Sequence, residues 1–213
     1  MDTDADDALG DHAPALHEAR LRFALGAVEA AGARSLLDLG CGSGALLKPA
    51  LALPRLERIV GVERSSQAVA VARRELAAYL EGPEPRLTLI AGSFLEGLPE
   101  PGLHCDAVTL VETIEHLPPD RLDALAGCVF EAAAPALVVV TTPNRDYNPL
   151  YGLATHEHRD PDHRFEWGRG RFRAWAARLA GRTGYRVTHG AIGESDPTRG
   201  APTQAAVFRR ESG

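Results

Sequence analysis

The 213-residue sequence predicts an α/β fold in which a mostly parallel sheet is covered by helices on both faces. Three observations support this class. Short apolar segments alternate with longer segments of helical apolar spacing, as in consecutive strand–helix units. A glycine-rich turn follows the first short apolar segment, at residues 38–44. The fifth such segment, residues 136–142, contains an unbroken run of Leu and Val, which is typical of a parallel strand buried on both faces.

The first part of the chain is expected to supply four strands and the helices between them. A helix over residues 14–31 is indicated by the spacing of Leu16, Leu21, Phe23, Leu25 and Val28. Short buried strands then follow at residues 34–39, 58–63, 87–91 and 106–111. Helices are expected between the first three of them, over residues 43–53 and 65–80.

The second part is expected to complete a seven-stranded sheet. Residues 119–133 read as a helix, because its prolines lie in the first turn, where a missing N–H costs little. Residues 143–170 form a connection too long to be ordinary, and such loops are usually functional or disordered. A helix over residues 171–182 places Phe172, Trp175 and Leu179 on one face. The last two strands are expected at residues 185–192 and 204–209, and ligands at the carboxyl ends of the strands.

Composition indicates one globular domain over residues 13–213, preceded by a disordered acidic tail over residues 1–12. Hydrophobic residues make up 45% and charged residues 24%, a normal globular balance. No apolar run approaches the roughly 20 residues of a membrane span, and five early Asp residues argue against a secretory signal. The dispersed cysteines Cys41, Cys105 and Cys128 indicate a reducing compartment, so we expect a cytoplasmic protein.

The charge is unevenly distributed along the chain. The net charge is −6, but residues 141–190 contain nine Arg against five acidic residues. A basic segment on an acidic body is a candidate surface for phosphate contacts, and well-solvated arginines are the alternative interpretation.

The glycine-rich turn predicts a site for a cofactor. Residues 38–44 read Asp-Leu-Gly-Cys-Gly-Ser-Gly, after a strand and before a helix. Glycines at Gly40, Gly42 and Gly44 allow a tight turn and a close approach to a ligand. Glu63 ends the second strand, where a carboxylate can accept hydrogen bonds from the ribose hydroxyls of an adenosine.

The same turn separates two classes of cofactor. A dinucleotide site needs two residues between its second and third glycines, and this sequence has one. With Asp38 at its start, the segment resembles the Asp-x-Gly-x-Gly-x-Gly pattern of class I methyltransferases. S-adenosylmethionine is therefore the expected cofactor, with Ser93, after the third strand, included among its binding residues.

A candidate metal constellation follows the fourth strand, at the rim where reacting groups belong. If residues 112–116 form one helical turn, the side chains of Glu112, Glu115 and His116 project on one side. Two carboxylates and an imidazole suit a hard or borderline divalent ion. The long loop offers a fourth ligand from His156, His158 or His163. The alternative is a solvated turn without a metal.

Three blocks of sequence together resemble one family. Residues 111–117, Val-Glu-Thr-Ile-Glu-His-Leu, resemble the metal motif of the RNA 3′-terminal ribose 2′-O-methyltransferases, which act on small RNAs and on repaired bacterial RNAs. Residues 141–144 with Tyr147 and Asn148 are similar to the family's next block, and residues 162–167 to its third. The likeness runs from about Leu21 to Phe208.

The resemblance implies a Rossmann-like class I methyltransferase fold, with Mn²⁺ or Mg²⁺ as a second cofactor. It implies four metal ligands, Glu112, Glu115, His116 and His163, which act in catalysis through the metal. The implied substrate is the 2′-hydroxyl of the 3′-terminal ribose of an RNA. An RNA end-healing kinase or ligase is a candidate partner, and neither DNA nor a membrane is expected.

Several side chains of the long loop have a functional and a structural interpretation. Phe165 and Trp167 either stack on a terminal base or anchor the loop in the core, and the second is favoured because aromatic side chains are usually buried. Arg145, Arg164 and Arg169 are candidate phosphate contacts.

Three other functions compete with RNA methylation. A metal-independent class I methyltransferase of a small metabolite would not respond to a chelator. A non-catalytic adenosylmethionine-binding subunit would have no reason to retain both the loop and four ligands. A dinucleotide-dependent oxidoreductase is disfavoured by the glycine spacing.

Overall fold

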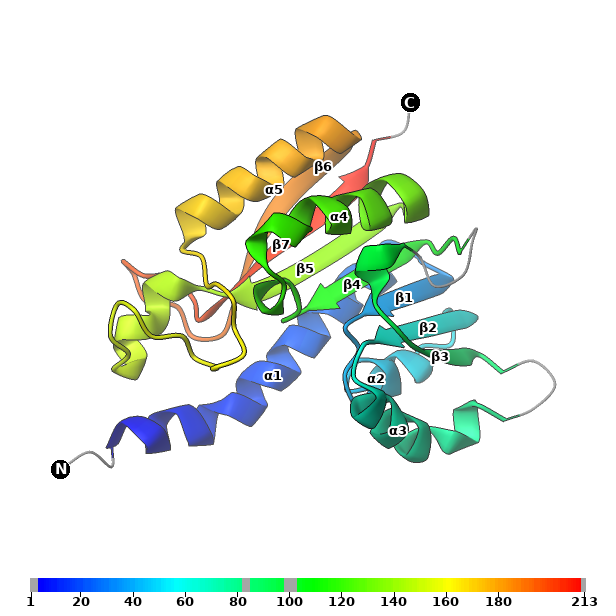
Figure 1. The fold of residues 1–213 in the computed structure, drawn as a ribbon, viewed down its shortest axis with the longest axis horizontal. Coiled ribbons are helices and arrows are strands. Elements are labelled where there is room, and N and C mark those ends of the chain that lie inside the picture. Colours follow the sequence, from blue (N-terminus) through cyan, green and yellow to red (C-terminus); the bar gives the residue numbers. More distant parts are fainter. Residues whose placement is uncertain (1–3, 82–84, 98–102, 212–213) are drawn as a thin grey trace.

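The computed structural model of the protein describes residues 4–81, 85–97 and 103–211. It contains one seven-stranded sheet with the strand order β3-β2-β1-β4-β5-β7-β6 (Figure 1). The strands are β1 (Ser35–Leu39), β2 (Arg58–Glu63), β3 (Leu87–Ala91), β4 (Ala107–Val111), β5 (Leu137–Pro143), β6 (Tyr185–Ile192) and β7 (Thr203–Arg210). β1 to β5 run parallel to one another, whereas β7 is antiparallel to both β5 and β6. The predicted seven-stranded, mostly parallel sheet is confirmed.

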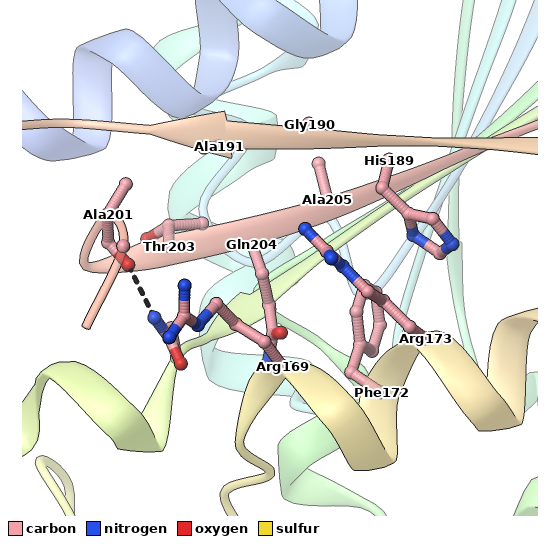
Figure 2. Close-up of a pocket in the computed structure, with 12 residues that line it drawn as sticks. Arg169, Phe172, Arg173, His189, Gly190, Ala191, Ala201, Thr203, Gln204 and Ala205 are labelled. Carbon is pink, nitrogen blue, oxygen red and sulfur yellow. Dashed lines mark hydrogen bonds between the residues drawn. The ribbon is translucent and has the colours of Figure 1, made fainter. Parts of the chain in front are cut away.

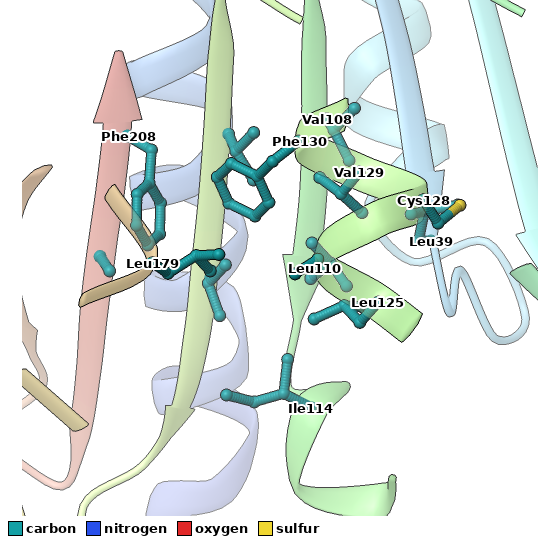
Figure 3. Close-up of a cluster of buried hydrophobic side chains, with 14 of the residues drawn as sticks. Leu39, Val108, Leu110, Ile114, Leu125, Cys128, Val129, Phe130, Leu179 and Phe208 are labelled. Carbon is teal, nitrogen blue, oxygen red and sulfur yellow. The ribbon is translucent and has the colours of Figure 1, made fainter. Parts of the chain in front are cut away.

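Helices cover both faces of the sheet, as predicted. On one face lie α1 (Asp4–Ala30), α2 (Leu47–Leu51) and α3 (Ser66–Glu75), which pack with β-strand side chains such as Leu36 and Ile59. On the other lie α4 (Leu122–Ala126), the π-helix η5 (Gly127–Ala133) and α5 (Arg169–Thr183). Figure 3 shows this second layer, where Phe130 and Leu179 meet Leu110 of β4 and Phe208 of β7. No helix in the described part of the chain is long and apolar enough to cross a membrane.

The predicted helices differ from the observed ones mainly at their ends. The helix expected over residues 43–53 is α2 alone, because Gly44 has a φ of +91° and the chain from Ser43 to Leu46 forms turns. The helix expected over residues 65–80 is α3, capped by the Ser65 side chain, followed by the 3₁₀ turn η1 (Ala77–Tyr79). The helix expected over residues 119–133 begins as the 3₁₀ turn η4 (Pro119–Arg121) and continues through α4 and η5.

The first helix is longer than the sequence suggests. α1 begins at Asp4 and continues through Pro14, whereas we expected a disordered tail over residues 1–12 and a helix from residue 14. A packed helix extends readily, because each residue added after nucleation contributes a hydrogen bond. Residues 4–12 are therefore helical in this structure, and residues 1–3 lie outside the described part of the chain.

The long connection between β5 and α5 is ordered and contains the 3₁₀ helix η6 (Arg145–Tyr151), which was not predicted. The Asn144 side chain accepts a hydrogen bond from the Asp146 N–H at the start of η6, and Gly152 ends it with a φ of +74°. Asn144 also forms a β-bridge with Trp167. This bridge brings the end of the loop back to the carboxyl end of β5.

Candidate active site

The glycine turn between β1 and α2 has a backbone that requires glycine. Gly40, Gly42 and Gly44 have φ values of +77°, +55° and +91°, in the left-handed region that side chains disfavour. A Cβ on Gly40 would lie 2.6 Å from Cγ2 of Thr113, whereas one on Gly42 would meet nothing within 4 Å. The turn therefore packs closely against the end of β4 at Gly40 and leaves open space at Gly42.

The carboxylate of Glu63 holds this turn in place. Its Oε2 accepts a hydrogen bond from the Gly42 N–H (3.1 Å), and its Oε1 accepts one from the Ser65 N–H (2.7 Å). Ser93 starts the 3₁₀ turn η2 (Phe94–Glu96) after β3, where its hydroxyl accepts from the Leu95 N–H (3.3 Å). The sequence placed these residues on successive strand ends, and the structure brings them to one pocket.

That pocket has a volume of about 470 Å³ and opens at the carboxyl ends of β1 to β4. It is lined by Gly40, Gly42, Glu63, Arg64, Ser93, Phe94, Leu95, Glu112, Thr113, His116, Leu117, Pro118, Asp162 and Arg164. The glycine turn thus shares one cavity with Glu112 and His116 of the predicted metal constellation, whereas Glu115 and His163 lie behind its lining. A donor and an acceptor of a small group can meet there.

Asp38 is not one of the lining residues. Its carboxyl is 3% exposed, and its Oδ1 accepts a hydrogen bond from the Thr109 hydroxyl at 2.7 Å. Burial raises the pKa of Asp38 to about 7, the Thr109 hydrogen bond opposes this increase, and the charge of Glu63 adds to it. Asp38 therefore lies under the turn as a buried acid close to its point of ionisation at neutral pH.

Three of the four predicted metal ligands come together. Glu115, His116 and His163 each offer one ligand atom, and these atoms lie within 4.8 Å of one another. The rings of the two histidines are 4.9 Å apart and nearly perpendicular. One carboxylate and two imidazoles form a donor set suited to a borderline divalent cation.

The carboxylate of Glu115 is fully buried and only half satisfied. Its Oε2 accepts a hydrogen bond from the Thr142 hydroxyl (2.9 Å), and its Oε1 has no hydrogen-bond partner in the described structure. Burial, and then the charge of Glu112, hold the pKa of Glu115 well above its usual range. A buried carboxylate oxygen without a partner is costly, and a bound cation would satisfy it.

The imidazole of His163 is oriented by a buried carboxylate. Its Nδ1 lies 2.6 Å from Oε1 of Glu166, whose side chain has no exposed surface. Glu166 also accepts from Nδ2 of Asn148 (2.6 Å) and from the Arg159 N–H (2.8 Å). Although burial alone would raise it, these hydrogen bonds lower the pKa of Glu166 to about 2. With Nδ1 donating to a carboxylate, Nε2 of His163 is left as the lone-pair nitrogen.

Glu112 is oriented differently from the other predicted ligands, and the expected helical turn over residues 112–116 is wrong. Glu112 has a φ of +49°, and its N–H continues the β4–β5 pairing by donating to the Thr141 carbonyl. Only Ile114–His116 forms a turn, of 3₁₀ type. The Glu112 carboxylate accepts from the Thr141 hydroxyl (2.8 Å) and pairs with Arg20 (3.0 Å). It lines the pocket but lies outside the three-residue group, so its role as a ligand stays a prediction.

The other histidines and the aromatic residues of the long loop lie away from the three-residue group or in the core. His156 is exposed and lies outside the three-residue group, as does His158, whose Nδ1 contacts the His163 carbonyl at 3.0 Å. Phe165 and Trp167 are buried and stacked on each other, with ring centroids 4.4 Å apart, which confirms that they anchor the loop. They are not available to stack on a base.

The three candidate phosphate arginines also differ from one another. Arg164 lines the pocket. Arg145 instead donates to the Thr155 carbonyl, and Arg169 pairs with Asp146 at 3.1 Å.

Other residues of the site were not predicted. Arg20 comes from α1, more than 90 positions before its partner Glu112, so sequence spacing gave no signal for the contact. Arg159 is largely buried and donates to the carbonyls of Asn144 and Pro202 (2.6 and 2.8 Å). The sequence block that contains Thr141, Thr142 and Asn148 gave no sign that these residues support Glu112, Glu115 and Glu166, respectively.

The sheet order, the glycine turn and the position of the pocket define a Rossmann-like class I methyltransferase domain, a fold that supports S-adenosylmethionine as the cofactor. Comparison with known proteins agrees. A family model described as a methyltransferase domain matches residues 37–135.

The comparisons also define the family. The small RNA 2′-O-methyltransferases of Mus musculus and Arabidopsis thaliana are 35% and 34% identical to this chain over 94% and 93% of its length. The matches cover 52% and 23% of those proteins, so the chain spans about half the length of the mouse relative. The solved methyltransferase domain of bacterial CtHen1 is 36% identical with a TM-score of 0.81, and the match covers 92% of this chain and 100% of that domain. The chain belongs to the family of Hen1 methyltransferase domains.

Proposed function

We propose that this chain transfers the methyl group of S-adenosylmethionine to the 2′-hydroxyl of the 3′-terminal ribose of an RNA, with the help of a divalent cation. The observation that carries the proposal is the shared pocket. Gly42 and Glu63 line one part of it, and His116 lines another part together with residues of the His163 loop. The names of the relatives supply the RNA 2′-hydroxyl as the acceptor.

The donor is expected to lie along the glycine turn. Gly42 has no neighbour within 4 Å of its Cβ position, so a ligand can approach the backbone there. Glu63 at the end of β2 is placed to accept hydrogen bonds from ribose hydroxyls, and its present partner is the N–H of Gly42. Ser93, Phe94 and Leu95 provide the wall beyond β3.

The metal is expected to lie between Glu115, His116 and His163, because their ligand atoms converge and Glu115 Oε1 lacks a partner. A divalent cation, Mn²⁺ or Mg²⁺, supplies Lewis acidity that lowers the pKa of a ribose hydroxyl. Glu112 becomes the fourth ligand if its carboxylate exchanges Arg20 for the cation. Arg20 otherwise keeps the charge of Glu112 balanced next to the buried Glu115.

The acceptor is expected to enter over His116 and Arg164, which line the same pocket as the donor site. Arg164 follows His163 directly, and its N–H donates to the Glu115 carbonyl at 2.7 Å. Its backbone is thus held next to the metal group, and its side chain lines the pocket, where it can neutralise a terminal phosphate. We further propose a cytoplasmic protein, consistent with three buried free cysteines, and an RNA end-healing kinase or ligase as a partner.

The test is transfer of a labelled methyl group to short synthetic RNAs with free 2′ and 3′ hydroxyls, with added Mn²⁺ or with a chelator. We expect methylation that stops on chelation, and that stops when the 3′ end carries a phosphate. His163→Ala should lose activity by orders of magnitude while S-adenosylmethionine affinity survives. The matched control is His156→Ala, an exposed histidine of the same loop.

Other outcomes identify the competing functions. Chelator-resistant methylation of a small metabolite, with no labelling of RNA, would replace the proposal with a metal-independent methyltransferase. Equal rates on blocked and free RNA ends would contradict the choice of the terminal ribose.

A further inference from the structure

A second, smaller pocket lies between α5 and the β6–β7 hairpin (Figure 2). Its volume is about 80 Å³, which is enough for a small ion but not for a nucleoside. Figure 2 shows Arg169, Phe172 and Arg173 reaching into it from α5, and His189 and Gln204 facing them from the two strands. None of these residues is needed for the donor or metal sites described above.

The pocket is positively charged. Arg169 and Arg173 are one helical turn apart on α5 and lie on the same side of the helix. Among the described residues that line the pocket, none is acidic. Arg173 has no hydrogen-bond or ion-pair partner in the described part of the chain. Burial and the charge of Arg173 lower the pKa of His189. Arg173 therefore faces the pocket without a counter-charge of its own.

One of the two arginines is fixed in position. The Nε of Arg169 pairs with Asp146 at 3.1 Å, and its Nη2 donates to the Thr198 carbonyl at 2.5 Å. The guanidinium of Arg173 is free to bind a ligand. A fixed positive charge next to a free guanidinium is an arrangement that recognises phosphate.

The floor of the pocket contains a buried polar group with a free acceptor. Gln204 is 5% exposed, and its Nε2 donates to the carbonyls of Pro143 (3.1 Å) and Trp167 (2.7 Å). Since both partners are acceptors, the amide cannot be turned over, and Oε1 is left without a hydrogen bond. Figure 2 shows this side chain extending from β7 toward α5, between Arg169 and Phe172. Because buried polar atoms are normally hydrogen-bonded, this oxygen is a site for a donor from a bound molecule.

The pocket is close to the proposed active site. Gln204 of β7 pairs with Thr142 of β5, and paired residues of antiparallel strands share a face with Cβ atoms about 5 Å apart. The Thr142 hydroxyl donates to Glu115. The pocket therefore lies one strand away from the strand that supports Glu115, within reach of a polymer whose end is at the metal group.

We propose that this pocket binds a backbone phosphate of the substrate RNA, upstream of the nucleotide whose ribose is methylated. The inference rests on the proposed RNA methylation and extends it to the path of the strand. Arg173 donates to the phosphate, Arg169 contributes fixed charge, and Gln204 offers an acceptor to a ribose 2′-hydroxyl next to the phosphate. The pocket gives the basic segment of residues 141–190 a specific role.

The experiment locates the contact by coupling a protein change to an RNA change. Single-stranded RNAs are made with one uncharged methylphosphonate linkage each, at successive positions from the 3′ end. Their binding to wild type, Arg173→Ala and Arg178→Ala is measured by fluorescence anisotropy. Arg178 is the matched control, because it is an exposed arginine of the same helix that does not line the pocket.

We expect one linkage at which wild type and Arg178→Ala lose affinity roughly three- to tenfold. Arg173→Ala should bind the unmodified RNA weaker by the same factor and be insensitive to that linkage, since the contact is already lost. Its affinity should also depend less steeply on salt, with about one unit less slope. Methyl transfer to an RNA too short to contain that linkage should be equal in wild type and Arg173→Ala.

Two results would overturn the proposal. The first is that wild type methylates RNA, but wild type and Arg173→Ala lose the same affinity at every uncharged linkage. The second is stabilisation by inorganic phosphate that Arg173→Ala abolishes, again without a coupled linkage, which would assign the pocket to free phosphate. If wild type binds the RNAs but methylates none, the proposed function fails instead, and the coupling still shows whether RNA occupies the pocket.

Discussion

Replacing Glu166 with Gln is expected to weaken binding of the proposed divalent cation without changing any of its proposed ligands. Glu166 accepts three hydrogen bonds, two at Oε1 and one at Oε2. A glutamine in the same position has an NH₂ group where one of these oxygens was. If the NH₂ group faces Asn148, it opposes the Nδ2 donor there. If it faces His163 and Arg159, it opposes two other donors.

Neither conflict can be relieved locally. Asn148 cannot turn its amide over, because its Oδ1 already accepts from Nε of Arg159 at 2.7 Å. At least one hydrogen bond to a buried carboxylate is therefore lost, which costs about 1.5–3 kcal/mol. Because Glu166 sets the orientation of His163, we expect Mn²⁺ affinity to fall roughly 10- to 100-fold.

The assay is a Mn²⁺ titration followed by electron paramagnetic resonance, together with urea unfolding of the metal-free protein. The matched control is Glu157→Gln, since Glu157 is an exposed acid of the same loop that accepts only the Ala154 N–H. A carboxylate with a lowered pKa stabilises the fold above its ordinary pKa, and this contribution is lost as pH falls toward 2. Unfolding of Glu166→Gln should depend less on pH in that range. Wild-type Mn²⁺ affinity in Glu166→Gln would refute the reasoning.

Three further changes test other parts of the site. Asp38→Asn should stabilise the donor-free protein at pH 8 more than at pH 4, by about 2–4 kcal/mol, because a carboxyl with a raised pKa costs stability as pH rises from its ordinary pKa to about 7; a pH-independent melting difference would contradict the burial argument. Gly40→Ala should lower the unfolding free energy more than Gly42→Ala, for which we expect only the roughly 1–2 kcal/mol cost of a side chain in the left-handed region. Equal melting temperatures of the two variants would argue against the close packing at Gly40. Thr142→Val should leave both oxygens of Glu115 without a hydrogen bond and lower the unfolding free energy by about 1–3 kcal/mol. Added Mn²⁺ should reduce this loss of stability, and a chelator should restore it.

Much of the fold could be predicted because its signals are local. Strands β2, β3 and β6 have the predicted bounds, since β2 and β3 are short apolar runs and β6 lies between Gly184 and Gly193. The glycine turn was predictable for the same reason, as three glycines within five residues leave few other conformations. Helix ends were less predictable, because they depend on tertiary contacts and caps.

The candidate site was predictable only in part. The strand ends place Glu115 and His116, and the family resemblance selects His163, whose approach to them depends on a loop fold that spacing alone does not determine. Glu112 shows the limit most clearly. Sequence spacing puts it beside Glu115 and His116, yet its left-handed backbone and the distant Arg20 direct its carboxylate elsewhere. Such long-range charge pairs leave no periodic trace in a sequence.

The hydrogen bonds of Arg159 and Asn144 fix the loop that carries His163, and this has a consequence for catalysis. Arg159 joins the loop to the segment before β7 through Pro202, and Nδ2 of Asn144 donates to the carbonyls of Arg199 and Ala201 (2.8 Å each). The loop that carries His163 is thus tied down at its start and near its middle by contacts within the protein. Binding of the proposed cation would then require no large ordering of the chain, and little binding free energy would be lost to conformational entropy. If the chain methylates RNA as proposed, we expect turnover not to be limited by the closure of a lid formed by this loop.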